Sequence, residues 1–145
     1  MFEKILFPTD FSDVAVKALQ YVKQLRDAGG REVVVLHVID QSNLELLSSC
    51  STVQDYMTIV MVKGRRATEE IGFISNELRQ LGFSVTERIE KGIPLRVVLK
   101  VAEEERPSVI VLGSHGKSNL EEMLLGSISE KVVRKSKHPV LVVKR

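Results

Sequence analysis

The chain has 145 residues, of which 43% are hydrophobic and 28% are charged, the ordinary balance of a globular protein with a core. Its formal net charge of +2 is too small to indicate a nucleic-acid-binding surface. Cys50 is the only cysteine, which excludes an internal disulfide and a metal site built from cysteines. No apolar run approaches the ~20 residues of a membrane span, and the first residues lack a signal-peptide layout. We therefore expect one domain over residues 1–145, located in the cytoplasm and without nucleic-acid or membrane partners.

Five short apolar runs predict strands. They are residues 5–7, 33–39, 85–89, 109–112 and 140–143. Most of these runs show no alternation with polar residues, as in strands of a parallel sheet whose two faces are both covered. The run 85–89 does alternate with polar residues, so we expect this strand at an edge of the sheet.

Helical periodicity fills the intervals between these runs. An apolar stripe from Val14 to Leu25 ends at two glycines, residues 29 and 30. Pro94 suits the first turn of a helix that stops before Pro107. Ser127 opens a final helix. The basic residues near its end offset the helix dipole and predict a last turn there; they are Lys131, Arg134, Lys135 and Lys137.

The longest periodic segment predicts one helix over residues 53–81. Two rows of small and apolar residues recur every seven positions. They are Met57, Gly64, Ile71 and Leu78, and beside them Val60, Ala67, Ile74 and Leu81. Residues 52–55 resemble a capping box. Two helices broken at residues 63–64 are the alternative. Residues 40–51 are expected to form a loop.

Strands and helices alternate along the chain, which predicts a doubly wound α/β fold with right-handed crossovers. Ligands of such folds bind beyond the carboxyl ends of the strands. These ends fall at residues 8–10, 38–40, 92–94 and from residue 113 onward.

A glycine-rich segment follows the fourth predicted strand, with the spacing Gly113-x2-Gly116-x9-Gly126-Ser127. Glycine allows a ligand to approach the backbone, and a helix N-terminus favours an anion. Together these residues predict a phosphate site, although each of them taken alone is explained better by a chain turn or a helix cap. It is not a Walker A motif, because Val111 stands where that motif has its first glycine. The glycine fingerprint of dinucleotide-binding folds should follow the first strand, but residues 8–13 contain no glycine.

Several segments are similar to the universal stress protein family. They are the glycine segment, residues 5–12 (ILFPTDFS), 36–40 (LHVID), 92–94 (GIP) and 139–143 (PVLVV). The spaced glycines resemble the ATP-binding branch of that family. The resemblance implies a Rossmann-like five-stranded sheet of order 3-2-1-4-5, and a nucleotide-dependent module of stress response or signalling.

The resemblance also implies a division of roles around ATP. Asp10 lies at the ribose, Pro8 and Thr9 shape the adenine side, and the backbone of Val38 meets the adenine edge. Leu112 packs near the adenine as well. The remaining residues of the implied site are near the ribose or around the phosphates, with His115 and Lys117 as possible charged contacts. They are Gly113, Ser114, His115, Gly116, Gly126, Ser127, Ile128 and Ser129.

The sequence shows no catalytic constellation, and we interpret His37 and His138 as structural. A binding module is therefore the first hypothesis, with Mg²⁺ or Mn²⁺ carried on the phosphates and any hydrolysis slow. A slow metal-assisted ATPase or adenylate-transferring enzyme and a nucleotide-free dimeric interaction module are the alternatives. In the implied strand order the last strand, residues 140–143, is an apolar edge. We expect it to pair with a second copy in a homodimer, unless the long helix or a loop covers it.

Overall fold

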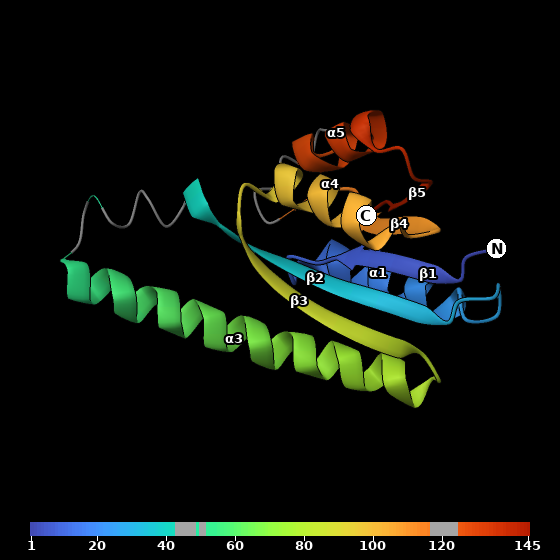
Figure 1. Cartoon of the computed structure of the whole chain (residues 1–145), viewed down its shortest axis with the longest axis horizontal. Coiled ribbons are helices and arrows are strands. Elements are labelled where there is room, and N and C mark those ends of the chain that lie inside the picture. The colour runs from blue at the N-terminus through green and yellow to red at the C-terminus, as the bar shows by residue number, and fades with distance from the viewer. Residues whose placement is uncertain (43–48, 50–51, 117–124) are drawn as a thin grey trace.

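The computed structural model describes residues 1–42, 49, 52–116 and 125–145 (Figure 1). The strands are β1 (Lys4–Pro8), β2 (Glu32–Asp40), β3 (Ser84–Gly92), β4 (Val109–Gly113) and β5 (Val140–Val143). The longer helices in the described part of the chain are α1 (Asp13–Gln24), α3 (Val53–Gln80), α4 (Pro94–Glu105) and α5 (Ser127–Lys135).

The five strands form one parallel sheet in the order β3-β2-β1-β4-β5. The predicted fold class and strand order are therefore confirmed. The strand predicted to be exposed, β3, lies at one edge, and β5 lies at the other.

Helices cover both faces of the sheet, because successive strand residues point to opposite sides. Ile5 and Phe7 of β1 pack with α1 and α3, whereas Leu6 packs with α4 and α5. All three side chains are fully buried. This two-layer core holds the carboxyl ends of the strands and the N-termini of the helices at one end of the sheet.

The long helix α3 is continuous from Val53 to Gln80, so the prediction of one helix is confirmed and the two-helix alternative does not occur. Its N-cap residue is Thr52, whose Oγ1 accepts a hydrogen bond from the Asp55 N–H at 3.2 Å. A Cβ at Gly64 or Gly72 would meet no atom within 4 Å, so neither glycine is required by packing. Within the described ranges, no helix is both long and apolar enough to span a membrane.

The prediction of a loop over residues 40–51 is wrong at its start. Asp40 ends β2, and Gln41 and Ser42 are helical, as is Ser49. The reason is local: the Asp40 carboxylate accepts a hydrogen bond from the Ser42 N–H at 3.0 Å, the bond by which an aspartate caps a helix. Residues 43–48 and 50–51 lie outside the described residues.

Candidate functional site

The turn after β1 is held by hydrogen bonds that its own residues make. The Thr9 N–H donates to the Leu36 carbonyl at 2.8 Å, and Thr9 Oγ1 accepts from the Phe11 N–H at 3.1 Å. Asp10 Oδ1 accepts from the Ser12 N–H at 3.0 Å, and Ser12 is the N-cap of α1. Thr9 is buried, whereas Asp10 is partly exposed. The carboxylate of Asp10 is thus fixed in place at the end of β1.

His37 supports this turn from β2. Its Nδ1 lies 2.8 Å from the Thr9 carbonyl oxygen, so Nδ1 must carry the proton, because a carbonyl only accepts. The ring stacks on Phe11 with centroids 4.4 Å apart. Phe11 has a φ of +63°, a conformation that a non-glycine residue adopts rarely. These contacts give His37 the structural role predicted from the sequence.

The backbone groups of Val38 point to the side of β1, one step past the last paired residue of that strand. Leu36 bonds to β1 through its carbonyl, and in a strand every second residue directs its N–H and C=O to the same neighbour. Val38 therefore directs these groups to the same side as Leu36. The paired part of β1 ends at Pro8, opposite Leu36. The side chain of Val38 packs against the core cluster that contains buried Leu112.

Two hydrogen bonds join the end of β4 to the start of α5, and a third joins it to β5. The Gly126 N–H donates to the Ser114 carbonyl at 2.6 Å, and the Ser114 N–H donates to the Val143 carbonyl at 2.8 Å. Ser129 Oγ donates to the Gly113 carbonyl at 2.7 Å. Because a hydroxyl has one proton, Ser129 can offer a phosphate only its main-chain N–H while this bond persists.

Gly126 is the N-cap of α5 and contributes no side-chain cap, so Ser127 is the first helical residue. The first N–H groups of a helix have no acceptor within it. The N–H groups of Ser127, Ile128 and Ser129 belong to this set and carry the positive end of the helix dipole. The first turn of α5 is therefore a site that favours an anion.

The three spaced glycines have different structural causes. A Cβ at Gly113 would lie 2.6 Å from Val14 Cγ1, so this glycine allows α1 to pack against β4. A Cβ at Gly126 would lie 3.1 Å from the Ser114 carbonyl oxygen. At Gly116 it would lie 3.0 Å from Asp10 Oδ2. The turn after β4 thus reaches the aspartate that follows β1.

The side chains of Ser114 and His115 also face each other. Ser114 is fully buried, and its Oγ lies 2.7 Å from His115 Nδ1. The predicted contact Lys117 lies outside the described residues.

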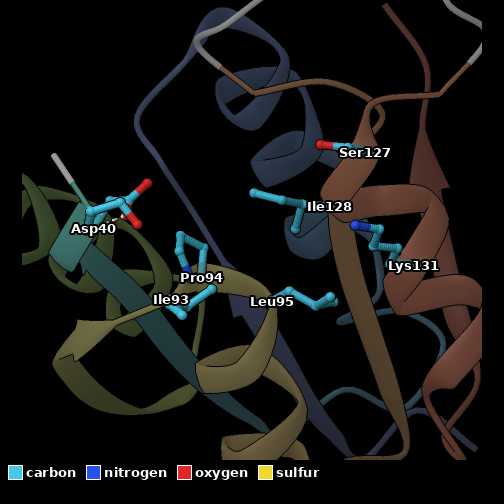
Figure 2. Close-up of a pocket in the computed structure, with 8 residues that line it drawn as sticks. Asp40, Ile93, Pro94, Leu95, Ser127, Ile128 and Lys131 are labelled. Atoms are coloured by element: carbon cyan, nitrogen blue, oxygen red, sulfur yellow. Dashed lines mark hydrogen bonds between the residues drawn. The ribbon is translucent and has the colours of Figure 1, made fainter.

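An open pocket of about 220 Å³ lies between β2, α4 and α5. Figure 2 shows Ser127, Ile128 and Lys131 on one side and Asp40 on the other. Its lining residues are Asp40, Ser42, Ile93, Pro94, Leu95, Ser127, Ile128 and Lys131. The pocket combines an apolar floor with one carboxylate and one ammonium group.

The prediction that Lys131 and Lys137 lie in the last turn of the final helix is wrong. The last turn holds Arg134 and Lys135, and Lys137 lies beyond the C-cap residue Ser136. Lys131 instead stands one turn after Ser127 and lines the pocket. The spacing of four residues from Ser127 is the signal that could have indicated this, because residues i and i+4 share a helix face.

The sequence matches the model of the universal stress protein family over residues 1–144. It is 40% identical over 156 aligned positions to the universal stress protein MJ0577 of Methanocaldococcus jannaschii, covering 100% of this chain and 96% of that protein. The solved structure of the hypothetical protein MJ0577 has a TM-score of 0.91 at 41% identity, covering 100% of this chain and 97% of that one.

More distant solved structures share the fold and contain nucleotides. One is a universal stress protein in complex with cAMP, with a TM-score of 0.68 at 21% identity, covering 97% of this chain and 96% of that one. Another is a family protein from Arabidopsis thaliana with AMP bound, with a TM-score of 0.70 at 17% identity, covering 98% of this chain and 91% of that one.

Proposed function

Because the chain belongs to the universal stress protein family, we propose that it binds ATP and acts as a nucleotide-dependent module of stress response or signalling. The nucleotide lies beyond the carboxyl ends of β1, β2 and β4. The observation that carries the proposal is that three features lie at this end of the sheet: the Asp10 carboxylate beside Gly116, the Val38 backbone past the paired end of β1, and the first turn of α5.

The phosphates bind to the first turn of α5. Main-chain N–H groups of Ser127, Ile128 and Ser129 donate to phosphate oxygens. Gly116 has no side chain to fill the space beside Asp10 Oδ2, and Gly126 lets the start of α5 lie against the Ser114 carbonyl. The hydroxyl of Ser127 is on the pocket side and can add a further donor. The buried hydroxyl of Ser129 holds α5 against the end of β4 instead.

The nucleoside lies over β1 and β2. The N–H and C=O of Val38 suit the donor and acceptor edge of adenine, with Pro8, Thr9 and Leu112 forming the surface beneath it. The carboxylate of Asp10, whose Oδ1 is fixed by the Ser12 N–H, accepts hydrogen bonds from ribose hydroxyls. Gly113, Ser114 and His115 close the ribose side.

We propose that binding of the nucleotide is the signal, rather than its hydrolysis. A divalent cation, Mg²⁺ or Mn²⁺, accompanies the triphosphate and neutralises part of its charge. Adenine nucleotides bind to other proteins of this fold, as the cAMP and AMP complexes show for those proteins. The proposal places the chain in the cytoplasm, where ATP is available.

The proposed site is tested by titration calorimetry, which measures the affinity of the Gly116→Val variant for ATP. The new side chain would start 3.0 Å from Asp10 Oδ2, so we expect ATP binding to be lost while the fold persists. Gly72→Val is the matched control, since its Cβ enters open space on α3. Unchanged affinity in Gly116→Val would place the nucleotide elsewhere. A wild-type protein that binds none of ATP, ADP and AMP would contradict nucleotide binding itself.

We also propose a homodimer formed through β5. In the described part of the chain this strand pairs with β4 on one side, and α3 packs against β2 and β3 at the other end of the sheet. The long helix therefore does not cover the β5 edge. Pairing of two β5 strands about a two-fold axis would satisfy the outward backbone groups of both copies.

A further inference from the structure

A carboxylate to which the proposed ATP site gives no role lines the pocket at the end of β2. The side chain of Asp40 is partly exposed and points from the strand toward Ile128 on the other side of the pocket (Figure 2). Among the residues that the structure describes, no lysine or arginine forms an ion pair with this carboxylate. A negative charge in a pocket with an apolar floor is suited to a ligand that donates hydrogen bonds.

One oxygen of this carboxylate has a structural role. Asp40 Oδ1 accepts the hydrogen bond from the Ser42 N–H at 3.0 Å that caps the helical residues after β2. This bond also fixes the orientation of the carboxylate. An ionised carboxylate has two oxygens and about four acceptor positions, so most of its capacity remains for a ligand in the pocket.

The surfaces beside the carboxylate suit a planar ring. Ile93 and Pro94 line the pocket next to Asp40, and Ile128 lines it from α5. Ile93 is 42% exposed and Ile128 is 41% exposed, so both have apolar surface that a ligand can cover. The pocket volume of about 220 Å³ is below the roughly 300–1,000 Å³ of sites that enclose a whole small molecule. The pocket is therefore suited to one part of a nucleotide, and the wall that contains Asp40 is suited to the base.

The direction of β2 determines which group of the base is nearest to Asp40. The N–H of Val38 precedes its C=O along the strand, and both point to the side of β1. In the proposed site the N–H donates to N1 of adenine, and the C=O accepts from the 6-amino group. The amino group therefore lies further along β2 than N1. Asp40 is two residues further along, on the same face of the sheet as Val38.

We propose that the Asp40 carboxylate accepts the second hydrogen of the 6-amino group and thereby selects adenine over 6-oxo purines, such as guanine and hypoxanthine. This inference rests on the ATP site proposed above. A 6-oxo purine has an acceptor oxygen where adenine has its amino group. That oxygen would face the carbonyl of Val38 and the negative charge of Asp40, and both acceptors would be left without a donor.

Titration calorimetry with three triphosphates tests this contact. They are ATP, ITP, whose base has a 6-oxo group, and purine riboside triphosphate, which has neither group and serves as the reference for the loss of a charge. Asp40→Asn keeps the shape of the side chain and its capping bond, but replaces one acceptor with an amide donor. Relative to the reference, we expect the variant to bind ATP about fivefold more weakly and ITP about threefold more tightly.

Two further variants make the test specific. Asp40→Ser also caps a helix, but its hydroxyl is too short to reach the base, so it should show the same relative loss for ATP. Asp27→Asn is the control, because it removes an exposed carboxylate after α1, at the other end of the sheet. It should leave the relative affinities of all three triphosphates unchanged.

The possible failures are distinguishable. If wild type and Asp40→Asn have the same ratio of ATP to ITP affinity, Asp40 does not read the base, and the ATP site itself still stands. An equal loss of affinity for all three triphosphates would also overturn the inference, because Asp40 would then act only by capping the residues after β2. A wild-type protein that binds none of ATP, ADP and AMP would refute the proposed function and this inference together.

Discussion

At the scale of single residues, the proposed phosphate site consists mostly of main-chain N–H groups, and Lys131 brings a full positive charge near them. Lys131 lines the same pocket as Ser127 and Ile128. A triphosphate carries more negative charge than a monophosphate, so an ammonium group near the first turn of α5 should favour ATP over AMP.

We predict that Lys131→Met lowers the affinity for ATP about fivefold and the affinity for AMP less, because an exposed ion pair contributes modestly. Calorimetry with both nucleotides measures the ratio. Lys135→Met is the control, since Lys135 is in the last turn of the same helix. Equal losses for ATP and AMP would show that Lys131 does not contact the outer phosphates.

Gly113 illustrates a glycine that packing requires. Its added Cβ would lie 2.6 Å from Val14 Cγ1 and 3.2 Å from the Val14 carbonyl carbon. We predict that Gly113→Ala lowers the free energy of unfolding by about 1–3 kcal/mol, the usual cost of overpacking. Gly72→Ala should instead raise it by up to about 1 kcal/mol, because alanine is the better helix former. Urea denaturation of both variants measures the difference, and equal stabilities would refute this account.

At the scale of elements, an ionic cluster joins β3 to α4. The Arg88 guanidinium lies 2.7 Å from Glu90, 2.8 Å from Glu104 and 3.2 Å from Glu105. Glu105 also lies 2.9 Å from the Lys4 ammonium of β1. The hydrogen bonds that the Arg88 guanidinium donates to Glu90, with a further contribution from Glu104, raise the pKa of Arg88 above its usual range. The cluster thereby fastens the edge strand β3 to the sheet and to its covering helix.

Hydrogen bonding to Lys4, with a further contribution from Arg88, lowers the pKa of the Glu105 carboxyl in the folded state. Between this lowered pKa and the ordinary carboxyl pKa, the unfolded chain binds more protons than the folded one. The contribution of Glu105 to stability is therefore present above the ordinary carboxyl pKa and is lost as the pH falls through the lowered one.

We predict that Glu105→Gln reduces the loss of stability on acidification. Urea midpoints from about pH 7 to about pH 3 measure it. Glu69→Gln, which removes an exposed carboxylate of α3, should leave the acid dependence as in the wild type. The effect should be small, since solvent screens much of this partly exposed cluster. Parallel pH curves for wild type and Glu105→Gln would contradict it.

At the scale of the whole molecule, the sheet has two edge strands, β3 and β5, and the proposed dimer forms through β5. The Pro139 carbonyl accepts from the Ile110 N–H, and the Val143 carbonyl accepts from the Ser114 N–H. In a parallel ladder the alternation then directs the backbone groups of Val140 and Val142 to the open side of β5.

We predict that Val142→Pro abolishes the β5 dimer and leaves the monomer folded, because it removes an outward N–H without touching the ladder to β4. Val142→Ala keeps this N–H and should keep the dimer. Analytical ultracentrifugation measures the mass of the particle, which should fall to half when the dimer is lost. A dimer that survives Val142→Pro would show that β5 strands do not pair.

The sequence by itself determined the elements and their order in this protein. Apolar runs without alternation marked the buried strands, and alternation marked the edge strand β3. Seven-residue recurrence from Met57 to Leu78 marked one continuous helix. Such features depend on residues close in the chain, so local patterns contain them.

Only the tertiary structure decided which distant residues meet. It brought Gly116 to Asp10, used the Ser129 hydroxyl to hold Gly113, and put Lys131 in the pocket. It also left the first half of α3 beyond the sheet. The physical reason is that a local pattern fixes the conformation of a segment, whereas contacts across a hundred residues follow from sheet register and helix packing. Those depend on the whole core at once.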